Sequence, residues 1–205
     1  MRRTIWLLVL WVVFVAPDHA LRAQNSDNRR GFWVNVGLGY GSLGIACREC
    51  GSSPRRGGGT LSFYLGATPS VHLRLGVGGG FWLHSLRRGR TPEVNYGGLL
   101  ASYYPRRRGG LIAEAGIGVS NYIELNGSGD FLEPTSAETT YVSGTGVGLT
   151  LALGWDFPSG RRSWGPRLTY LVGDIGPLHG PNGQTAATGW KQNLILLEIV
   201  FRGGP

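Results

Sequence analysis

Residues 148–157 read GLTLALGWDF and show the pattern that decides the fold. Leucine or tryptophan occupies every odd position from 149 to 155, while small or polar residues fill the positions between. Because successive side chains of a β-strand point to opposite faces, the stretch predicts a strand with one apolar face and one small, polar face.

The same alternation recurs seven more times along the chain. The further stretches are 31–41, 60–68, 71–78, 94–104, 111–120, 167–172 and 195–201. With 147–156 they give about eight candidate strands of about nine to eleven residues, the length with which a tilted strand crosses a bilayer. The register of 94–104 stays open because Leu99 and Leu100 are adjacent.

The connections between these stretches alternate in length. The long or intermediate ones are 42–59, 84–93, 121–140 and 174–188, and the short ones are 69–70, 105–110 and 157–163. Outer-membrane barrels alternate long outer loops with short periplasmic turns. The sequence therefore predicts an all-β, closed, antiparallel up-and-down transmembrane β-barrel of about eight strands, with both termini on the periplasmic side.

Whether the barrel lies in a membrane or in water depends on the direction in which its apolar face points. A soluble barrel, such as a secreted carrier of small ligands, packs its apolar face inward. The other face of these strands is too rich in glycine, serine and threonine to build a hydrophobic core. An apolar face of this extent in water would exceed what soluble monomers tolerate. We therefore expect it to face lipid, with the secreted soluble barrel as the alternative.

Five charged residues share the non-lipid face on different strands. They are Arg74, Glu114, Asp156, Arg167 and Glu198. The lumen of a barrel of this size is just wide enough for side chains, and buried charges must be paired. We predict an internal salt-bridge network. Asp156 and Arg167 could instead lie at the rims in water.

The N-terminus has the features of a secretory signal. Arg2 and Arg3 precede an uncharged apolar run over 5–16 that is too short for a comfortable membrane span. We expect residues 1–23 to be a signal peptide cleaved near Ala23, with Ala20 as the second choice and an uncleaved anchor as the alternative. Residues 24–205 then form one barrel domain, exported to the outer membrane.

The chain is basic, with a formal net charge of +8. Nucleic acid is an unsuitable partner because the chain is exported and its arginines fall in turns, so anionic lipid headgroups fit better. Candidate contacts to lipid phosphates are Arg55, Arg56, Arg87 and Arg88. Simple solvation of these turns is the alternative.

Cys47 and Cys50 form a Cys-Arg-Glu-Cys motif in the first long connection. A metal site would need further ligands, and a redox centre of the thioredoxin type would need a helix N-terminus. A local disulfide, or a pair of free thiols, is therefore the simplest interpretation. We predict no catalytic, cofactor-binding or metal-binding residue and no cofactor.

Four segments carry a family resemblance. They are FWVNVGLGYG at 32–41, LIAEAGIGVS at 111–120, GLTLALGWDF at 148–157 and LILLEIVF at 194–201. The chain resembles small outer-membrane β-barrels related to the transmembrane domain of outer membrane protein A and to outer membrane protein X. The resemblance implies outer-membrane lipids and the barrel-assembly machinery as partners. Such barrels usually end at an aromatic residue, whereas Phe201 is followed by Arg-Gly-Gly-Pro.

We expect a monomeric, non-enzymatic outer-membrane protein with a structural or surface-contact role through its outer loops. A general pore is not expected, because side chains fill the lumen. A lipid-modifying enzyme is the second hypothesis, since some small outer-membrane barrels use a Ser–His pair. His84 and Ser85 are adjacent, so on a strand their side chains would point apart.

Overall fold

The computed structural model describes residues 31–47, 51–84, 89–106, 110–127, 139–159, 162–180 and 184–204. The predicted signal peptide, Cys50, Arg87 and Arg88 lie outside these residues. The strands within them are β1 (Gly31–Cys47), β2 (Gly51–Ser52), β3 (Arg56–Ser70), β4 (Leu73–His84), β5 (Gly89–Tyr103), β6 (Gly110–Gly127), β7 (Thr139–Ser159), β8 (Arg162–His179) and β9 (Thr185–Gly203). Among the described residues, no helix is long and apolar enough to span a membrane.

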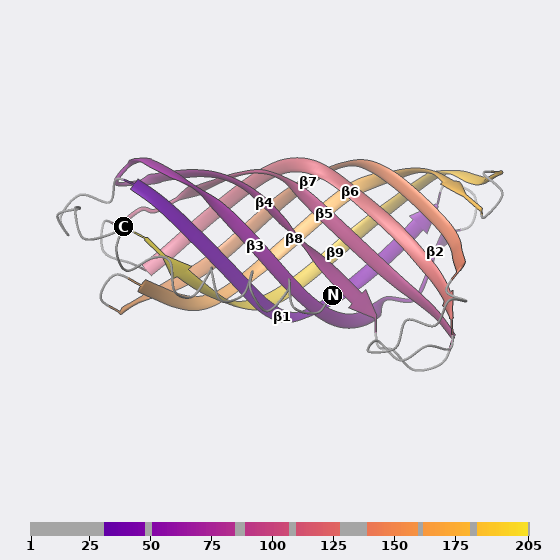
Figure 1. Cartoon of the computed structure of the whole chain (residues 1–205), viewed down its shortest axis with the longest axis horizontal. Coiled ribbons are helices and arrows are strands. Elements are labelled where there is room, and N and C mark those ends of the chain that lie inside the picture. The colour runs from indigo at the N-terminus through magenta and orange to yellow at the C-terminus, as the bar shows by residue number, and fades with distance from the viewer. Residues whose placement is uncertain are drawn as a thin grey trace, which may run out of the picture.

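The strands close into a barrel (Figure 1). From β3 to β9 each strand pairs antiparallel with the next, β1 pairs with β3, and β1 also pairs with β9. The short β2 pairs only with the end of β1. The predicted closed, antiparallel, up-and-down barrel with eight long strands is confirmed. Closure matters in lipid because it leaves no unpaired strand edge.

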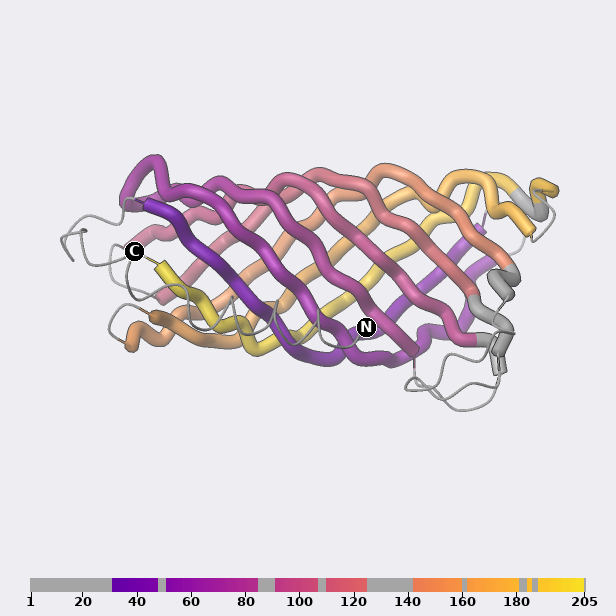
Figure 2. Tube along the Cα trace, in the orientation of Figure 1, coloured from indigo at the N-terminus to yellow at the C-terminus, as the bar shows by residue number. Residues whose placement is uncertain are grey.

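The barrel has two different ends. At one, which we call the turn end, β3 turns directly into β4, and the end of β9 lies beside the start of β1 (Figure 2). At the other, the loop end, β1 is followed by β2 and β8 is followed by β9. The predicted alternation of connection lengths is only partly kept: 85–88 at the loop end is shorter than 104–109 at the turn end, because the strands extend into the predicted loops.

The strands are longer than predicted, and the predicted loops are correspondingly too long. β4, the shortest of the eight, has 12 residues and β7 has 21. Residues 42–47 and 56–59, expected in the first loop, belong to β1 and β3, and strands likewise take up much of 121–140, 157–163 and 174–188. The reason is that backbone pairing continues after the alternation of apolar residues has ended.

The apolar side chains point outward, as predicted. Ile117 and Leu151, in the middle of their strands, are 54% and 58% exposed. The open register of β5 is also resolved, because Leu99 is exposed and Leu100 is buried in the lumen. Every second residue of these strands faces outward, and we call the outward-facing residues the apolar belt. They lie within 32–40, 61–67, 73–81, 97–103, 111–119, 147–157, 164–172 and 195–201. A soluble carrier barrel would show the opposite arrangement.

A row of glycines crosses the barrel wall at mid-height. Its members are registered with one another on β4 to β8: Gly78, Gly98, Gly118, Gly148 and Gly173. A Cβ added to Gly98 would lie 2.2 Å from the carbonyl oxygen of Ile117. Neighbouring backbones therefore approach too closely in parts of this row for any other residue.

Candidate functional site

Among the residues that the structure describes, six charged side chains are buried in the lumen, three cations and three anions. They are Arg74, Glu114, Asp156, Arg167, Glu198 and Arg202, all at most 6% exposed. We call them the charge network. The five residues that the sequence places on the inner face all lie there, and Asp156 and Arg167 are as buried as the others rather than solvated at a rim.

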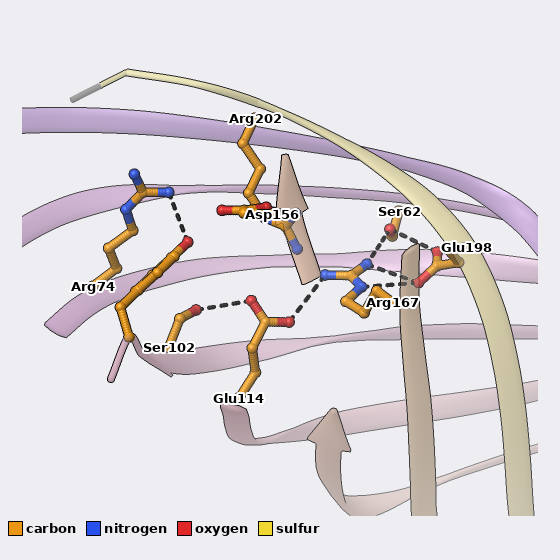
Figure 3. Close-up of polar contacts among 9 residues, drawn as sticks. Ser62, Arg74, Ser102, Glu114, Asp156, Arg167, Glu198 and Arg202 are labelled. Atoms are coloured by element: carbon orange, nitrogen blue, oxygen red, sulfur yellow. Dashed lines mark hydrogen bonds and ion pairs between the residues drawn. The ribbon is translucent and has the colours of Figure 1, made fainter. Parts of the chain in front are cut away.

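Arg167 joins two carboxylates of the network, Glu114 and Glu198 (Figure 3). Its Nη2 is 2.8 Å from Oε2 of Glu198, and its Nη1 is 3.3 Å from Oε2 of Glu114. Nη2 also donates to the hydroxyl of Ser62 at 2.7 Å. The guanidinium stands 5.6 Å from the ring centroid of Tyr64 on β3, so this side chain crosses the lumen from β8. One cation thus holds two carboxylates in a space closed to water.

The remaining charges lie toward the turn end. Arg202 pairs with Asp156, and Arg74 donates to the hydroxyl of Tyr104 at 2.9 Å, with its guanidinium 4.8 Å from the ring centroid. Sequence reasoning missed Arg202. The sequence could have shown it, because Arg202 follows Glu198 on β9 by an even number of residues and therefore faces the lumen as well.

The loop half of the lumen is mainly apolar, with Thr60, Ser120 and Gln192 as buried polar exceptions. Its buried apolar side chains are Leu43, Trp82, Val94, Tyr96, Tyr122, Leu171, Ile175, Leu178, Leu194 and Leu196. Ile45, Val142 and Trp190 pack against them, and we call the whole set the apolar plug. The expected inner face of glycine, small polar residues and a few charges is therefore wrong for this half. It missed a hydrophobic core in the loop half of the lumen.

The outer wall changes character at the level of the plug. On the loop side of the apolar belt, the outward-facing positions carry Ser42, Asn95, Asn121, Thr145, Asp174 and Asn193. Asn95, Asn121 and Thr145 are registered across β5, β6 and β7. We call the part of the barrel from this polar row to the loop end the collar. Its outside is mainly polar, with Leu83 and Ile123 as exceptions, and its inside is mainly apolar, with Gln192 buried in it and the Arg56–Glu124 pair at the mouth.

The arginines that were candidates for lipid phosphate have different positions. The Nη1 of Arg56 is 3.9 Å from Oε1 of Glu124 on β6. Because β3 and β6 are not neighbours, this pair spans the mouth of the barrel on its inner side. Arg55 lies against the outer wall, where it donates to Ser42 and Asn193. Of the two candidates that the structure describes, Arg55 faces outward and Arg56 faces inward.

The histidines show no catalytic geometry within the described residues. His84 Nδ1 is 2.6 Å from the carbonyl oxygen of Gly57, and His72 Nδ1 is 2.7 Å from that of Tyr104. A triad would need an acid to orient the imidazole, whereas the hydrogen bonds described for these two rings are to backbone carbonyls. Nothing in these contacts favours the lipid-modifying enzyme.

Cys47 is disulfide-bonded. It ends β1 at the loop end, where the strand pairs with β2. Cys50, the other cysteine of the sequence, lies outside the described residues, so the pairing of the two remains a prediction.

Comparisons with known proteins point to one architecture. No protein-family model matches the sequence, and no curated protein matches it. The crystal structure of the neisserial surface protein A is similar with a TM-score of 0.55 at 12% identity, over 85% of this chain and 97% of that one. The attachment invasion locus protein of Yersinia pestis is similar with a TM-score of 0.47 at 10% identity, over 83% and 97%. At 12% identity the similarity to the neisserial surface protein A shows the fold alone, and with the closed topology it gives the chain the fold of the small eight-stranded outer-membrane β-barrels.

Proposed function

We propose that the protein is a closed barrel of the outer membrane that serves as a rigid support for contacts at the cell surface, and that it is not a general pore. The observation that carries this proposal is the filled lumen. The charge network occupies the turn half and the apolar plug the loop half, with Trp82, Leu194 and Leu196 fully buried. A continuous aqueous path would need both sets of side chains to move.

A planar-bilayer recording tests the closed lumen. The purified protein should insert without stepwise conductance under conditions in which a porin gives clear steps. Its folding is verified independently by the shift in gel mobility between boiled and unboiled samples, which a closed barrel shows. Regular conductance steps from the folded wild-type protein would refute the proposal.

The surface role requires the collar to face outward from the cell. Lys191 is the single lysine of the sequence and is exposed on the outer wall of the collar. An amine reagent that does not cross membranes should therefore label intact cells at Lys191, and the Lys191→Gln variant should lose that label. Labelling only after the cells are broken would place the collar on the periplasmic side and refute the surface role.

The proposal includes two further partners. The apolar belt requires membrane lipids around the barrel, and Phe201 remains on its outward face near the end of β9 at 53% exposure. An outward aromatic at this point fits the signal that the barrel-assembly machinery recognises. We propose a monomer, because the closed barrel leaves no strand edge for a second copy.

A further inference from the structure

The guanidinium of Arg55 is fixed at the level where the apolar belt ends. Its Nε donates to the hydroxyl of Ser42 at 2.9 Å, Nη2 donates to the Ser42 carbonyl oxygen, and Nη1 donates to the side-chain oxygen of Asn193. Ser42 is the next outward-facing residue after Tyr40, which is 65% exposed. Arg55 therefore lies across the seam at which β1 and β9 close the barrel.

A glycine leaves room for this arrangement. A Cβ on Gly44 would lie 2.9 Å from Nη1 of Arg55 and 2.8 Å from Oδ1 of Asn193. Both distances are too short for an ordinary contact, so a side chain at this position would push the guanidinium away from the wall. The flat placement of Arg55 thus depends on Gly44.

The charge at this level is uneven around the barrel. Near Arg55, Lys191 is exposed on the same outer face of β9, with Asp174 as its registered neighbour on β8. These three residues carry a net positive charge. On β5, Glu93 faces outward beside Asn95, which donates to it at 2.8 Å. Among the residues that the structure describes, the outer wall at this point therefore carries a negative charge.

We propose that the outer wall at the closing seam binds the phosphate of a membrane lipid headgroup, with Arg55 as the main cation and Lys191 as the second. This inference deepens the proposed function and depends on its placement in the membrane. Phosphates are the anions found where the hydrocarbon core ends. The guanidinium carries more N–H donors than Ser42 and Asn193 use, and holding it in place beforehand lowers the entropy lost on binding.

The test uses the full protein, purified from membranes and placed in phosphatidylcholine nanodiscs. Spin-labelled phosphatidylglycerol and spin-labelled phosphatidylcholine are compared by the fraction that the protein immobilises. The wild type should prefer phosphatidylglycerol. Arg55→Gln should reduce that preference about fivefold, the usual effect of one cation at an anionic membrane surface. Arg56→Gln is the matched control, because its partner Glu124 lies on the inner side of the mouth.

A second variant separates charge from position. Gly44→Ala keeps every charge but displaces Arg55, so it should also weaken the preference while the gel-mobility shift shows a folded barrel. An unchanged preference in Arg55→Gln, or an equal loss in Arg56→Gln, would overturn the proposal. Displacement of phosphatidylglycerol by inorganic phosphate beyond that by chloride at equal ionic strength would assign the site to a soluble phosphate and overturn the lipid assignment. A closed, surface-exposed barrel would survive either failure.

Discussion

Replacing Arg167 with methionine should strongly destabilise the barrel. The substitution keeps an apolar stem and removes the cation that holds Glu114 and Glu198. The side chains of these two acids are 1% and 0% exposed. Ser102 and Ser62 still donate to them, but neither serine supplies charge. Breaking a buried pair by removing one partner costs about 3–5 kcal/mol, because the other charge stays buried without compensation.

The assay is urea unfolding of the protein in lipid vesicles, followed by tryptophan fluorescence and by the gel-mobility shift. Arg56→Met is the control, because its pair with Glu124 is 3.9 Å long and the Arg56 side chain is 43% exposed. An exposed pair contributes about 1 kcal/mol or less. The control should therefore unfold close to the wild type, and Arg167→Met at a clearly lower urea concentration.

A triple variant identifies the cause. Combining Arg167→Met with Glu114→Gln and Glu198→Gln removes the two stranded charges and should recover most of the lost stability. If Arg167→Met unfolded within about 1 kcal/mol of the wild type, the lumen would be hydrated well enough to solvate both acids. A triple variant no more stable than the single one would show that lost packing, rather than stranded charge, explains the effect.

Three further predictions concern the wall and the loop end. Leu151→Arg, in the middle of the apolar belt, should cost about 2–4 kcal/mol in urea unfolding from vesicles, whereas Thr145→Arg on the collar should cost about 1 kcal/mol or less; equal costs would mean that the belt is misplaced. Gly118→Ala should prevent closure of the barrel as judged by gel mobility, because the added Cβ would lie 2.1 Å from the Gly97 carbonyl oxygen. Gly59→Ala is the control and should fold normally, because its Cβ would have nothing within 4 Å. The disulfide of Cys47 should block alkylation until a reductant is added and should contribute about 2 kcal/mol if it closes the short loop to Cys50; free alkylation of the oxidised protein would contradict it.

The fold was predictable because the period of two along each strand is a local property. Which face meets lipid followed from the inner positions of the membrane-spanning stretches, where Gly148 and Gly154 could not form a core. The alternation along each strand also predicts that Arg167 and Glu198 face the lumen. Which cation holds which acid could not be predicted, because Arg167 reaches Glu114 across strands far apart in sequence.

The apolar plug escaped prediction for a related reason. In β9, Leu194 and Leu196 face the plug while Ile195 and Leu197 face lipid. At this height along the barrel the strand is apolar on both its inner and its outer face. The sequence therefore shows a continuous apolar run with no alternation. The adjacent pair Leu99 and Leu100 has a similar origin, because Leu100 packs in the lumen with Trp33 and Tyr64 in a second cluster, separate from the plug. A run of this kind within an otherwise alternating barrel sequence can therefore indicate where both faces of the wall are apolar.

The reversal between belt and collar explains why the strands extend past the membrane. A strand that left the lipid with a glycine-lined interior would have only backbone pairing to hold it against water, and isolated β-structure of that kind is marginal. Ile175 and Leu194 supply a buried core at this height, while Asp174 and Asn193 face outward. The collar is therefore stabilised as a soluble barrel is, by apolar burial inside a polar wall. Contacts at the cell surface would then be presented from a rigid rim.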